Sequence, residues 1–442
     1  MSSKNATDII SLHANVDGNI STSTTTALAI VNLPGKGRGY VATQPIKAGS
    51  IVHTAVPLAT TVSQEWMPET CMWCFAFSYP KRLRVKAVSE DDTKQLCHQW
   101  STRSRRKHTK AAKTFHLKDA LFCSEECKQQ WKEAGYPGEW ELVVASFSRL
   151  DKEFKRRVDV DEDTPMDGHP FLKKEILPLV HGECDWIDLN DDSALQIWID
   201  DAWTCATEHP DILFQQTISD MDRTMCRLIA ACLARRQCEQ AYLFHNNTLP
   251  SFEDLQVVQD NELAHFRLHY PSDGTGLVRR RSAQSLDHIP VEVLQIMHLY
   301  LFFAEAMAAT GTEPSLNHSQ QLFRFIYFRE MSNSFGLWER PDSDAVTDDQ
   351  ELLGWGIYTS AVYFNHSCDA NVIKRRQGRT MQFVAKRDIA QGEEACISYG
   401  SVEDSLKGRR KRLWENYHFK CACVRCLQEE EAQYQTKSIE SS

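Results

Sequence analysis

The sequence predicts an α+β fold in which short β-strands open and close the chain around a helical middle part. β-Branched runs punctuated by Gly and Pro lie at residues 29–32, 40–43 and 51–56, and strand-like runs return at 357–364, 380–385 and 394–398. Between residues 140 and 334, apolar side chains instead recur every three or four residues, which is typical of helices. The expected helices are 142–158, 194–207, 213–244, 291–309 and 319–331. Closely spaced cysteines interrupt the first β part and follow the second, which indicates separate metal-bound segments.

Composition and charge exclude several classes of protein. With 442 residues the chain is too long for one compact core, and two or three packed units are expected. The net charge of −10 argues against a general nucleic-acid coater and suits a basic peptide partner better. The best apolar stretch, 296–310, is short and broken by His298 and Glu305, so we expect no membrane-spanning segment. The first 26 residues contain no continuous apolar run, so no secretory signal and no oxidised thiols are expected.

Cysteine spacing points to zinc. The chain has 15 cysteines, so any one short spacing recurs by chance roughly half a time. Here the pairs Cys71/Cys74 and Cys123/Cys127 and the triplet Cys421, Cys423 and Cys426 occur together, and in a reducing compartment such clusters favour metal binding. The other predicted motifs are GKGRGY at 35–40, NHSCDAN at 365–371 and GEEACISYG at 392–400.

These motifs, in this order, resemble the SET-domain protein lysine methyltransferases. The CxxC and CxxxC pairs inserted after the first strands are similar to the SET and MYND subfamily, and the resemblance covers residues 28–427. It implies a SET β fold with a knot-like crossing after Asn365, a zinc-binding MYND-like insertion, a helical insert and a zinc-bound post-SET segment. The expected divisions are a disordered tail (1–27), the N-terminal part of the SET domain (28–70), a degenerate MYND-like module (71–135), the helical insert (136–330), the SET catalytic core (331–401), the post-SET segment (402–427) and an acidic tail (428–442).

The resemblance also implies roles for single residues. Tyr399 is predicted to be the catalytic residue, which directs its hydroxyl at the transferred methyl group and orients the lysine amine. Tyr358 and Tyr417 are expected to line the substrate channel. The predicted contacts to S-adenosylmethionine are Lys36, Gly37, Arg38, Gly39, Asn333, Asn365, His366, Tyr399 and Phe419. Simpler alternatives are a β-turn at the glycines, a helix C-cap at Asn333 and ordinary aromatic packing at Tyr417 and Phe419.

Two zinc ions are expected per chain. In the MYND pattern the first and third ligand pairs share one metal, which assigns Cys71, Cys74, Cys123 and Cys127 to one site. The last MYND pair is missing after Cys127, so Cys97 and His98 are expected to hold no metal, and binding of proline-rich peptides is in doubt. The second site is expected to combine Cys368 with Cys421, Cys423 and Cys426.

We therefore expect an S-adenosylmethionine-dependent protein-lysine N-methyltransferase that acts on a histone or a non-histone protein. The alternative is a catalytically silent zinc scaffold that recruits partners. The substrate is expected to carry its lysine in a basic segment. No heptad seam is present, so coiled-coil dimerisation is not expected, and the chain is expected to be a monomer. We expect the nucleus or the cytoplasm as its location. The basic run 103–113 admits a solvated loop, a nuclear-import signal or a patch for nucleic acid or an acidic partner.

Overall fold

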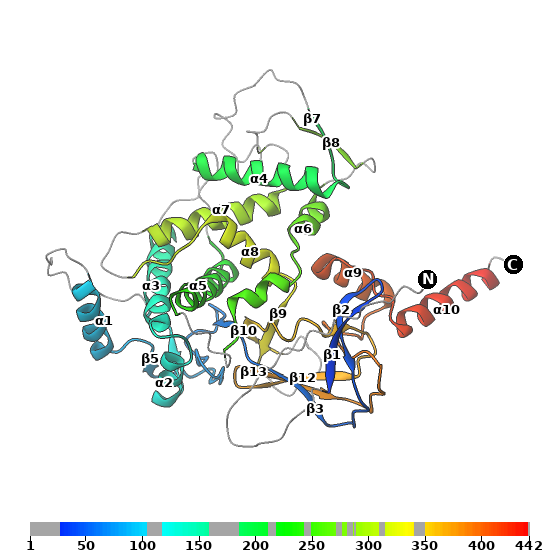
Figure 1. The fold of residues 1–442 in the computed structure, drawn as a ribbon, viewed down its shortest axis with the longest axis horizontal. Coiled ribbons are helices and arrows are strands. Elements are labelled where there is room, and N and C mark those ends of the chain that lie inside the picture. Colours follow the sequence, from blue (N-terminus) through cyan, green and yellow to red (C-terminus); the bar gives the residue numbers. More distant parts are fainter. Residues whose placement is uncertain are drawn as a thin grey trace, which may run out of the picture.

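The computed structural model is a mixed assembly of helices and sheets (Figure 1). It describes residues 27–103, 117–158, 185–210, 218–242, 249–270, 276–280, 286, 289–308, 314–339 and 350–440. The α+β fold class is confirmed. The predicted N-terminal tail up to residue 26 and the basic run from residue 104 onward lie outside the described residues.

Strands from the two ends of the chain pair with one another. The hairpin of β1 (Leu28–Leu33) and β2 (Gly37–Ala42) is antiparallel, and Gly35 and Gly37 take positive φ in its turn. The two larger sheets have the orders β12-β13-β3 and β4-β10-β9. Their strands are β3 (Ile51–Ala55), β4 (Ala59–Val62), β9 (Ser334–Trp338), β10 (Leu352–Ile357), β12 (Val372–Gln377) and β13 (Thr380–Ala385).

The segment around the NHSC motif lies between the two ends of the chain. Strand β11 (Asn365–His366) pairs in parallel with β14 (Cys396–Ile397). On the other side, the Tyr40 amide donates to Tyr363 O at 2.9 Å. The predicted strand over 357–364 is wrong beyond Ile357, where β10 ends and turns begin. Residues 358–364 are apolar because they form turns that pack in the core, and not because they continue the strand. Tyr358, Ala361 and Phe364 are all buried.

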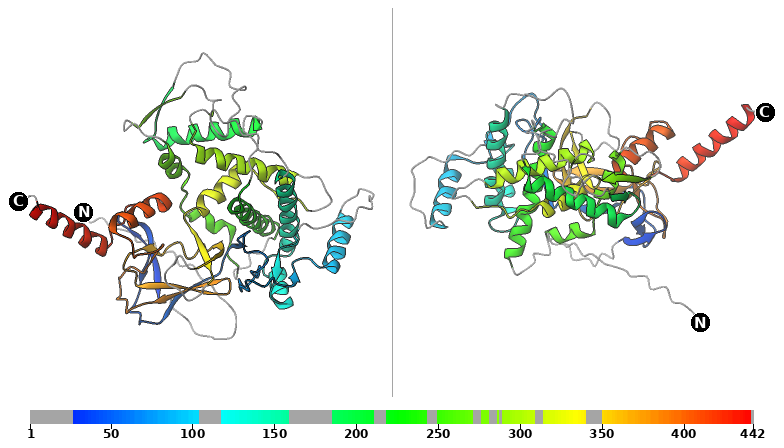
Figure 2. Two further views of the ribbon diagram at one scale, coloured as in Figure 1. Left: turned by 180° about the vertical axis from the view of Figure 1, so that it is seen from behind. Right: turned by 90° about the horizontal axis from the view of Figure 1, so that it is seen from above.

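The cysteine-rich segments carry short helices. In the MYND-like module, β5 (Val85–Lys86) pairs with β6 (Leu121–Phe122) beside α1 (Glu90–Arg103) and α2 (Glu125–Glu133). After the SET core come α9 (Leu406–Tyr417) and α10 (Val424–Glu440), and α10 projects from the body (Figure 2). The predicted boundary at 427 therefore falls inside a helix. Good helix formers and the Arg425–Glu429 pair at 2.8 Å extend that helix into the acidic tail.

The helical insert contains more helices and strands than its sequence pattern predicts. The predicted long helices are confirmed as α3 (Glu139–Val158), α4 (Asp192–Glu208), α5 (Asp220–Ala241), α7 (Val291–Ala308) and α8 (Gln320–Glu330). Shorter elements were not predicted because they are too short for a clear apolar period. They are β7 (Asp185–Asp188) paired with β8 (Leu277–Arg280), the 3-10 helix η3 (Phe252–Val257) and α6 (Glu262–His269).

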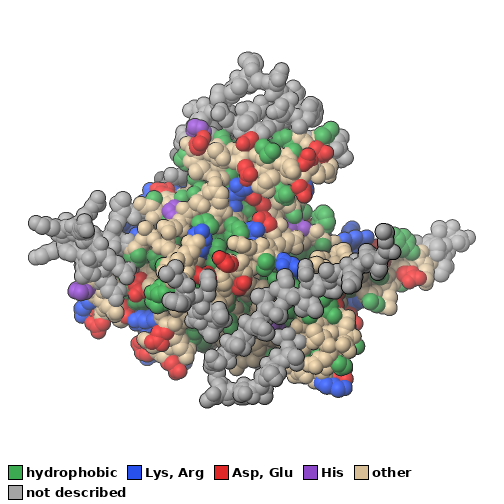
Figure 3. All heavy atoms as spheres, in the orientation of Figure 1, with side chains coloured by type: hydrophobic (Ala, Val, Ile, Leu, Met, Phe, Trp, Pro, Cys, Tyr) green, Lys and Arg blue, Asp and Glu red, His purple; other side chains and the backbone are tan. Residues whose placement is uncertain are grey.

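The surface carries charges of both signs. On the face shown in Figure 3, Lys and Arg side chains lie interspersed with Asp and Glu. Among the helices of the described residues, none has the length and apolar character that a membrane span requires.

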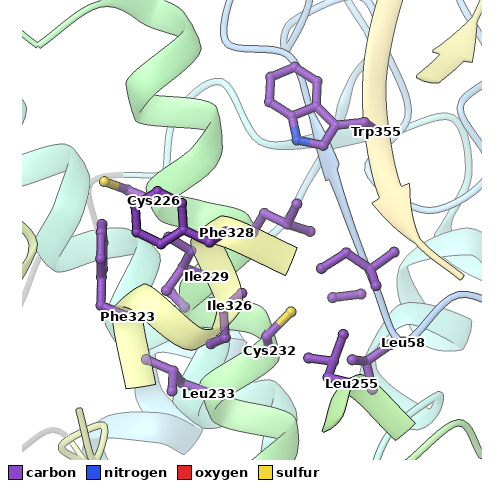
Figure 4. Packing of buried hydrophobic residues seen from close by; sticks show 14 of the residues in the cluster. Leu58, Cys226, Ile229, Cys232, Leu233, Leu255, Phe323, Ile326, Phe328 and Trp355 are labelled. Carbon is purple, nitrogen blue, oxygen red and sulfur yellow. The ribbon is translucent and has the colours of Figure 1, made fainter. Parts of the chain in front are cut away.

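The core joins the helical insert to the sheets. Helix α5 packs against α8 and against strand β4. Figure 4 shows Ile229 and Leu233 of α5 facing Phe323 and Ile326 of α8. In the helical insert, the described cysteines Cys205, Cys226, Cys232 and Cys238 are all buried. Buried cysteines of this kind pack as small apolar side chains.

Candidate active site

One pocket of about 520 Å³ collects residues from both ends and from the middle of the chain. Its walls come from the β1–β2 turn, the stretch between η3 and α6, the turn after α8, the NHSC segment and the post-SET segment. Nine predicted site residues line this pocket: Lys36, Gly37, Arg38, Asn333, Asn365, His366, Tyr399, Tyr417 and Phe419.

Asn365 is held by the strands that surround it. Its amide nitrogen donates to Glu394 Oε1 at 2.9 Å and lies 3.4 Å from Arg38 O. Glu394 also pairs with Lys36, with 2.5 Å between Oε2 and Nζ. Burial pushes the pKa of Lys36 down, but the ion pair outweighs this and the pKa is raised. Lys36 therefore stays protonated at the pocket.

Arg38 lies beside the same wall. Its guanidinium donates to Val257 O and sits 5.3 Å from the centre of the Tyr363 ring. This cation–π geometry and the backbone contact hold a positive charge at the pocket lining. Lys36 and Arg38, both predicted contacts to S-adenosylmethionine, thus line one pocket.

Tyr399 is a half-buried side chain of the pocket. Its hydroxyl donates to Phe364 O at 3.0 Å, and its ring centre lies 4.7 Å from that of Tyr417. Burial, together with the neighbouring Tyr417, raises the pKa of Tyr399. The phenol is therefore neutral at pH 7, so it can orient a ligand by hydrogen bonding but does not serve as a base.

His366 links Tyr399 to the cysteines. Its Nδ1 lies 3.2 Å from the Tyr399 amide nitrogen, and its Nε2 lies 3.3 Å from Cys368 Sγ. A backbone N–H only donates, so Nδ1 must be the acceptor and the ring proton must sit on Nε2. The ring thus donates toward the Cys368 sulfur, as expected for a group that orients a metal ligand.

Four cysteine sulfurs meet behind the pocket. Those of Cys368, Cys421, Cys423 and Cys426 lie within 4.8 Å of one another. Cys368 and Cys426 are 3.5 Å apart at their sulfurs, near the roughly 3.8 Å that a tetrahedral zinc with four thiolates requires. The buried Arg409 approaches Cys426 Sγ at 3.6 Å and pairs with Glu429 at 2.7 Å. A guanidinium here would offset the net negative charge of four thiolates around a bound zinc ion. These residues fit the predicted post-SET zinc.

A second cysteine group lies in the MYND-like module. The sulfurs of Cys71, Cys74, Cys123 and Cys127 also lie within 4.8 Å of one another. Ser124 caps helix α2 by accepting from the Cys127 amide, which fixes the last ligand. His98 lies on α1, while the side chain of Cys97 lies outside the described residues, so their lack of metal stays a prediction.

Comparison with known families decides the identity of the fold. The SET domain family matches residues 37–400 of the chain. The chain belongs to the SET-domain family. The fold class predicted from the motifs is thereby confirmed.

Relatives of this SET-domain protein include SET and MYND proteins. The potential protein lysine methyltransferase SET6 of Saccharomyces cerevisiae is 24% identical over 397 residues, which are 87% of this chain and 90% of that protein. The SET domain and MYND-type zinc finger protein 6 of Schizosaccharomyces pombe is 31% identical over 139 residues, 31% of this chain and 26% of that protein. The histone-lysine N-methyltransferase ASHR2 of Arabidopsis thaliana is 31% identical over 115 residues, 24% of this chain and 28% of that protein. The last two alignments thus cover about a quarter of each relative.

Two predicted residues of the SET domain do not line the pocket. Tyr358, predicted in the substrate channel, is fully buried and donates to Arg379 O at 2.6 Å. It points away because it follows directly on β10 and packs edge-on against Phe335. Gly39 acts on the site indirectly, since a Cβ atom there would lie 2.5 Å from Asn365 Nδ2. Its small size makes room for Asn365.

One wall of the pocket was missed by the sequence interpretation. Val257, Gln259 and Asn261 of the helical insert line it, as does Ser332. Gln259 O accepts from the Asn333 amide nitrogen at 3.3 Å, which joins this wall to the predicted Asn333. No motif marks these residues. The only local signal is Asn261, which precedes helix α6 and which a search for helix N-caps would find.

Proposed function

We propose that this SET-domain protein transfers methyl groups from S-adenosylmethionine to the side-chain amine of a lysine in another protein. The observation that carries the proposal is the convergence of Asn365, Tyr399 and Phe419, from three separate motifs, on one pocket. The name of the yeast relative, a potential protein lysine methyltransferase, supports the same activity.

The pocket residues fit this cofactor. Asn261 is 1% exposed, and its amide nitrogen donates to Phe328 O at 3.2 Å. Its buried Oδ1 has no hydrogen-bond partner among the described residues, so it can accept from a ligand or from a water in the pocket. S-Adenosylmethionine carries amino and hydroxyl donors for such an acceptor, and its carboxylate suits Lys36 and Arg38. The volume is also within the usual range for small-molecule sites.

The chain's own residues would perform orientation and charge stabilisation. When bound, S-adenosylmethionine supplies an electrophilic methyl group on a positively charged sulfur. The lysine ammonium must lose a proton first, which costs about 4.6 kcal/mol at pH 7 for a pKa of about 10.4. Tyr399, neutral and fixed by Phe364 O, keeps oxygen lone pairs with which to accept from the amine. The Tyr417 hydroxyl donates to Tyr399 O at 3.3 Å and holds that geometry.

The proposal includes the substrate class and the setting. A net charge of −10 favours a substrate whose lysine lies in a basic segment of a histone or another protein. We further propose that the chain acts as a monomer in the nucleus or the cytoplasm.

A methyl-transfer assay tests this function. The zinc-loaded chain would be incubated with methyl-labelled S-adenosylmethionine and with purified histones or a heat-treated cell extract. We expect label on N-methyl-lysine after acid hydrolysis, and its loss in Tyr399→Phe. Absence of labelled lysine in every fraction would instead favour the zinc-scaffold interpretation.

A further inference from the structure

A groove of about 640 Å³ lies between α9 and α10, separate from the proposed chemistry. Leu406, Trp414 and Tyr434 form its apolar part, and Lys407, Lys411 and Lys420 contribute amines. Lys420 also lines the cofactor pocket, so the groove and that pocket adjoin at this residue.

Two large rings are exposed at this groove. Trp414 is 53% exposed and Tyr434 is 70% exposed. Neither side chain is needed for the cysteine centre or for the cofactor pocket. Exposed aromatic side chains lining a groove are typical of a protein interaction site.

The groove is basic although the chain is acidic. Residues 406–425 contain seven Lys or Arg and one acidic residue, Glu415, in a chain with a net charge of −10. Figure 3 shows Lys or Arg and hydrophobic side chains close together near α9 and α10. This local charge contrast favours an acidic partner.

Part of this positive charge is not compensated within the chain. Arg410 pairs with Glu430 at 2.7 Å and, together with Lys420, lowers the pKa of Glu430 to about 2. The carboxylate of Glu430 therefore stays ionised, and the positive charges of Arg410 and Lys420 balance its charge. Lys411 lies 3.7 Å from Glu415 with 71% of its side chain exposed, and Lys407 has no ion pair among the described residues. The Lys407 amine is therefore available to a partner, and the exposed Lys411 amine can exchange its long contact with Glu415 for a partner carboxylate at little cost.

We propose that this groove docks an acidic peptide segment of a partner protein. One aromatic or aliphatic side chain of the segment packs between Trp414 and Tyr434, and flanking carboxylates bind Lys407 and Lys411. A peptide fits better than nucleic acid, because the phosphate backbone of a nucleic-acid strand needs a continuous row of Lys and Arg side chains. Here the basic residues of α9 give way to the carboxylates of α10 at Glu429, Glu430 and Glu431. The docking does not depend on the proposed methyl transfer.

Fluorescence polarisation on the full, zinc-loaded chain tests the proposal. The probe is a labelled synthetic peptide with a central Phe-Leu pair flanked by Asp and Glu. We expect binding that weakens with added salt. The affinity should fall about tenfold or more in the double variant Lys407→Glu with Lys411→Glu, and similarly in Trp414→Ala.

Matched variants and probes distinguish the alternatives. Lys81→Glu with Lys86→Glu makes the same charge change at two exposed positions of the MYND-like module and should leave the affinity unchanged. Thermal unfolding would verify that each variant is folded. The proposal is overturned if the peptide does not bind, if both double variants bind alike, or if a uridine oligonucleotide binds more tightly than the peptide and is lost in the groove variants.

Discussion

Replacing Tyr399 by Phe removes one hydroxyl and leaves the ring in place. The lost contact is the 3.0 Å bond to Phe364 O. A buried hydrogen bond contributes about 1 kcal/mol to stability, and an unsatisfied partner costs about 1–3 kcal/mol, so we expect a loss of about 1–2 kcal/mol. The effect on turnover should be larger, because a hydroxyl placed at the reacting groups contributes about 2.7–4 kcal/mol, or about 10²- to 10³-fold in rate.

Tyr40→Phe is a matched control for this substitution. Tyr40 is buried and Tyr399 is half-buried, and the Tyr40 hydroxyl likewise donates to a backbone carbonyl, Ser360 O, at 2.7 Å. It does not belong to the pocket lining. We expect a similar loss of stability in Tyr40→Phe with turnover close to that of the unchanged chain.

The assay combines denaturant unfolding, S-adenosylmethionine binding and methyl transfer for the two variants. Tyr399→Phe should bind the cofactor within a few-fold of the unchanged chain and lose turnover. Equal turnover in Tyr399→Phe and the unchanged chain would refute the assignment. An equal loss in Tyr40→Phe would show that the effect comes from destabilisation and not from the pocket.

Three further predictions follow from the geometry. Metal analysis should return two zinc ions per chain, and three would contradict the ligand assignment. Cys368→Ser should lose one zinc ion together with cofactor binding, whereas Cys123→Ser should lose the other zinc ion and keep cofactor binding. Gly39→Ala should weaken cofactor binding about tenfold by displacing Asn365, and titration calorimetry would show this, with an unchanged affinity as the contrary result. Burial raises the pKa of Glu330 to about 7, so its protonated form stabilises the fold below pH 4.5 and this contribution of about 3 kcal/mol is lost as the pH rises to 7. In Glu330→Gln the free energy of unfolding should change less between pH 4.5 and pH 7 than in the unchanged chain. The same pH dependence in both would contradict the burial argument.

The sequence predicts the residues that sit inside recognisable motifs. Asn365, His366 and Tyr399 are each embedded in a run whose neighbours also fit the family, so one-dimensional spacing suffices to find them. The same applies to the two cysteine groups, whose sulfurs gather as expected.

Residues placed by tertiary packing were not predictable in this way. Asn261 reaches the pocket because the loop before α6 folds against Phe328, and no local pattern encodes that contact. The place of Tyr358 outside the pocket lining has the converse reason: a tyrosine close to a motif looks accessible in sequence, while this side chain is buried against Phe335. Helix α10 was hidden by its composition, since a run of glutamates is typical of a solvated tail, whereas Arg425 and Cys426, one of the four clustered cysteines, anchor its first turn.

Calorimetric titration of the folded, zinc-loaded chain with S-adenosylmethionine, and separately with S-adenosylhomocysteine, tests the central claim most directly. The pocket geometry predicts binding of about one molecule per chain for each, with a weaker affinity in Asn365→Ala, which loses the 2.9 Å bond to Glu394. No binding by protein that is folded and holds its zinc would contradict the methyltransferase account and leave the zinc scaffold in its place.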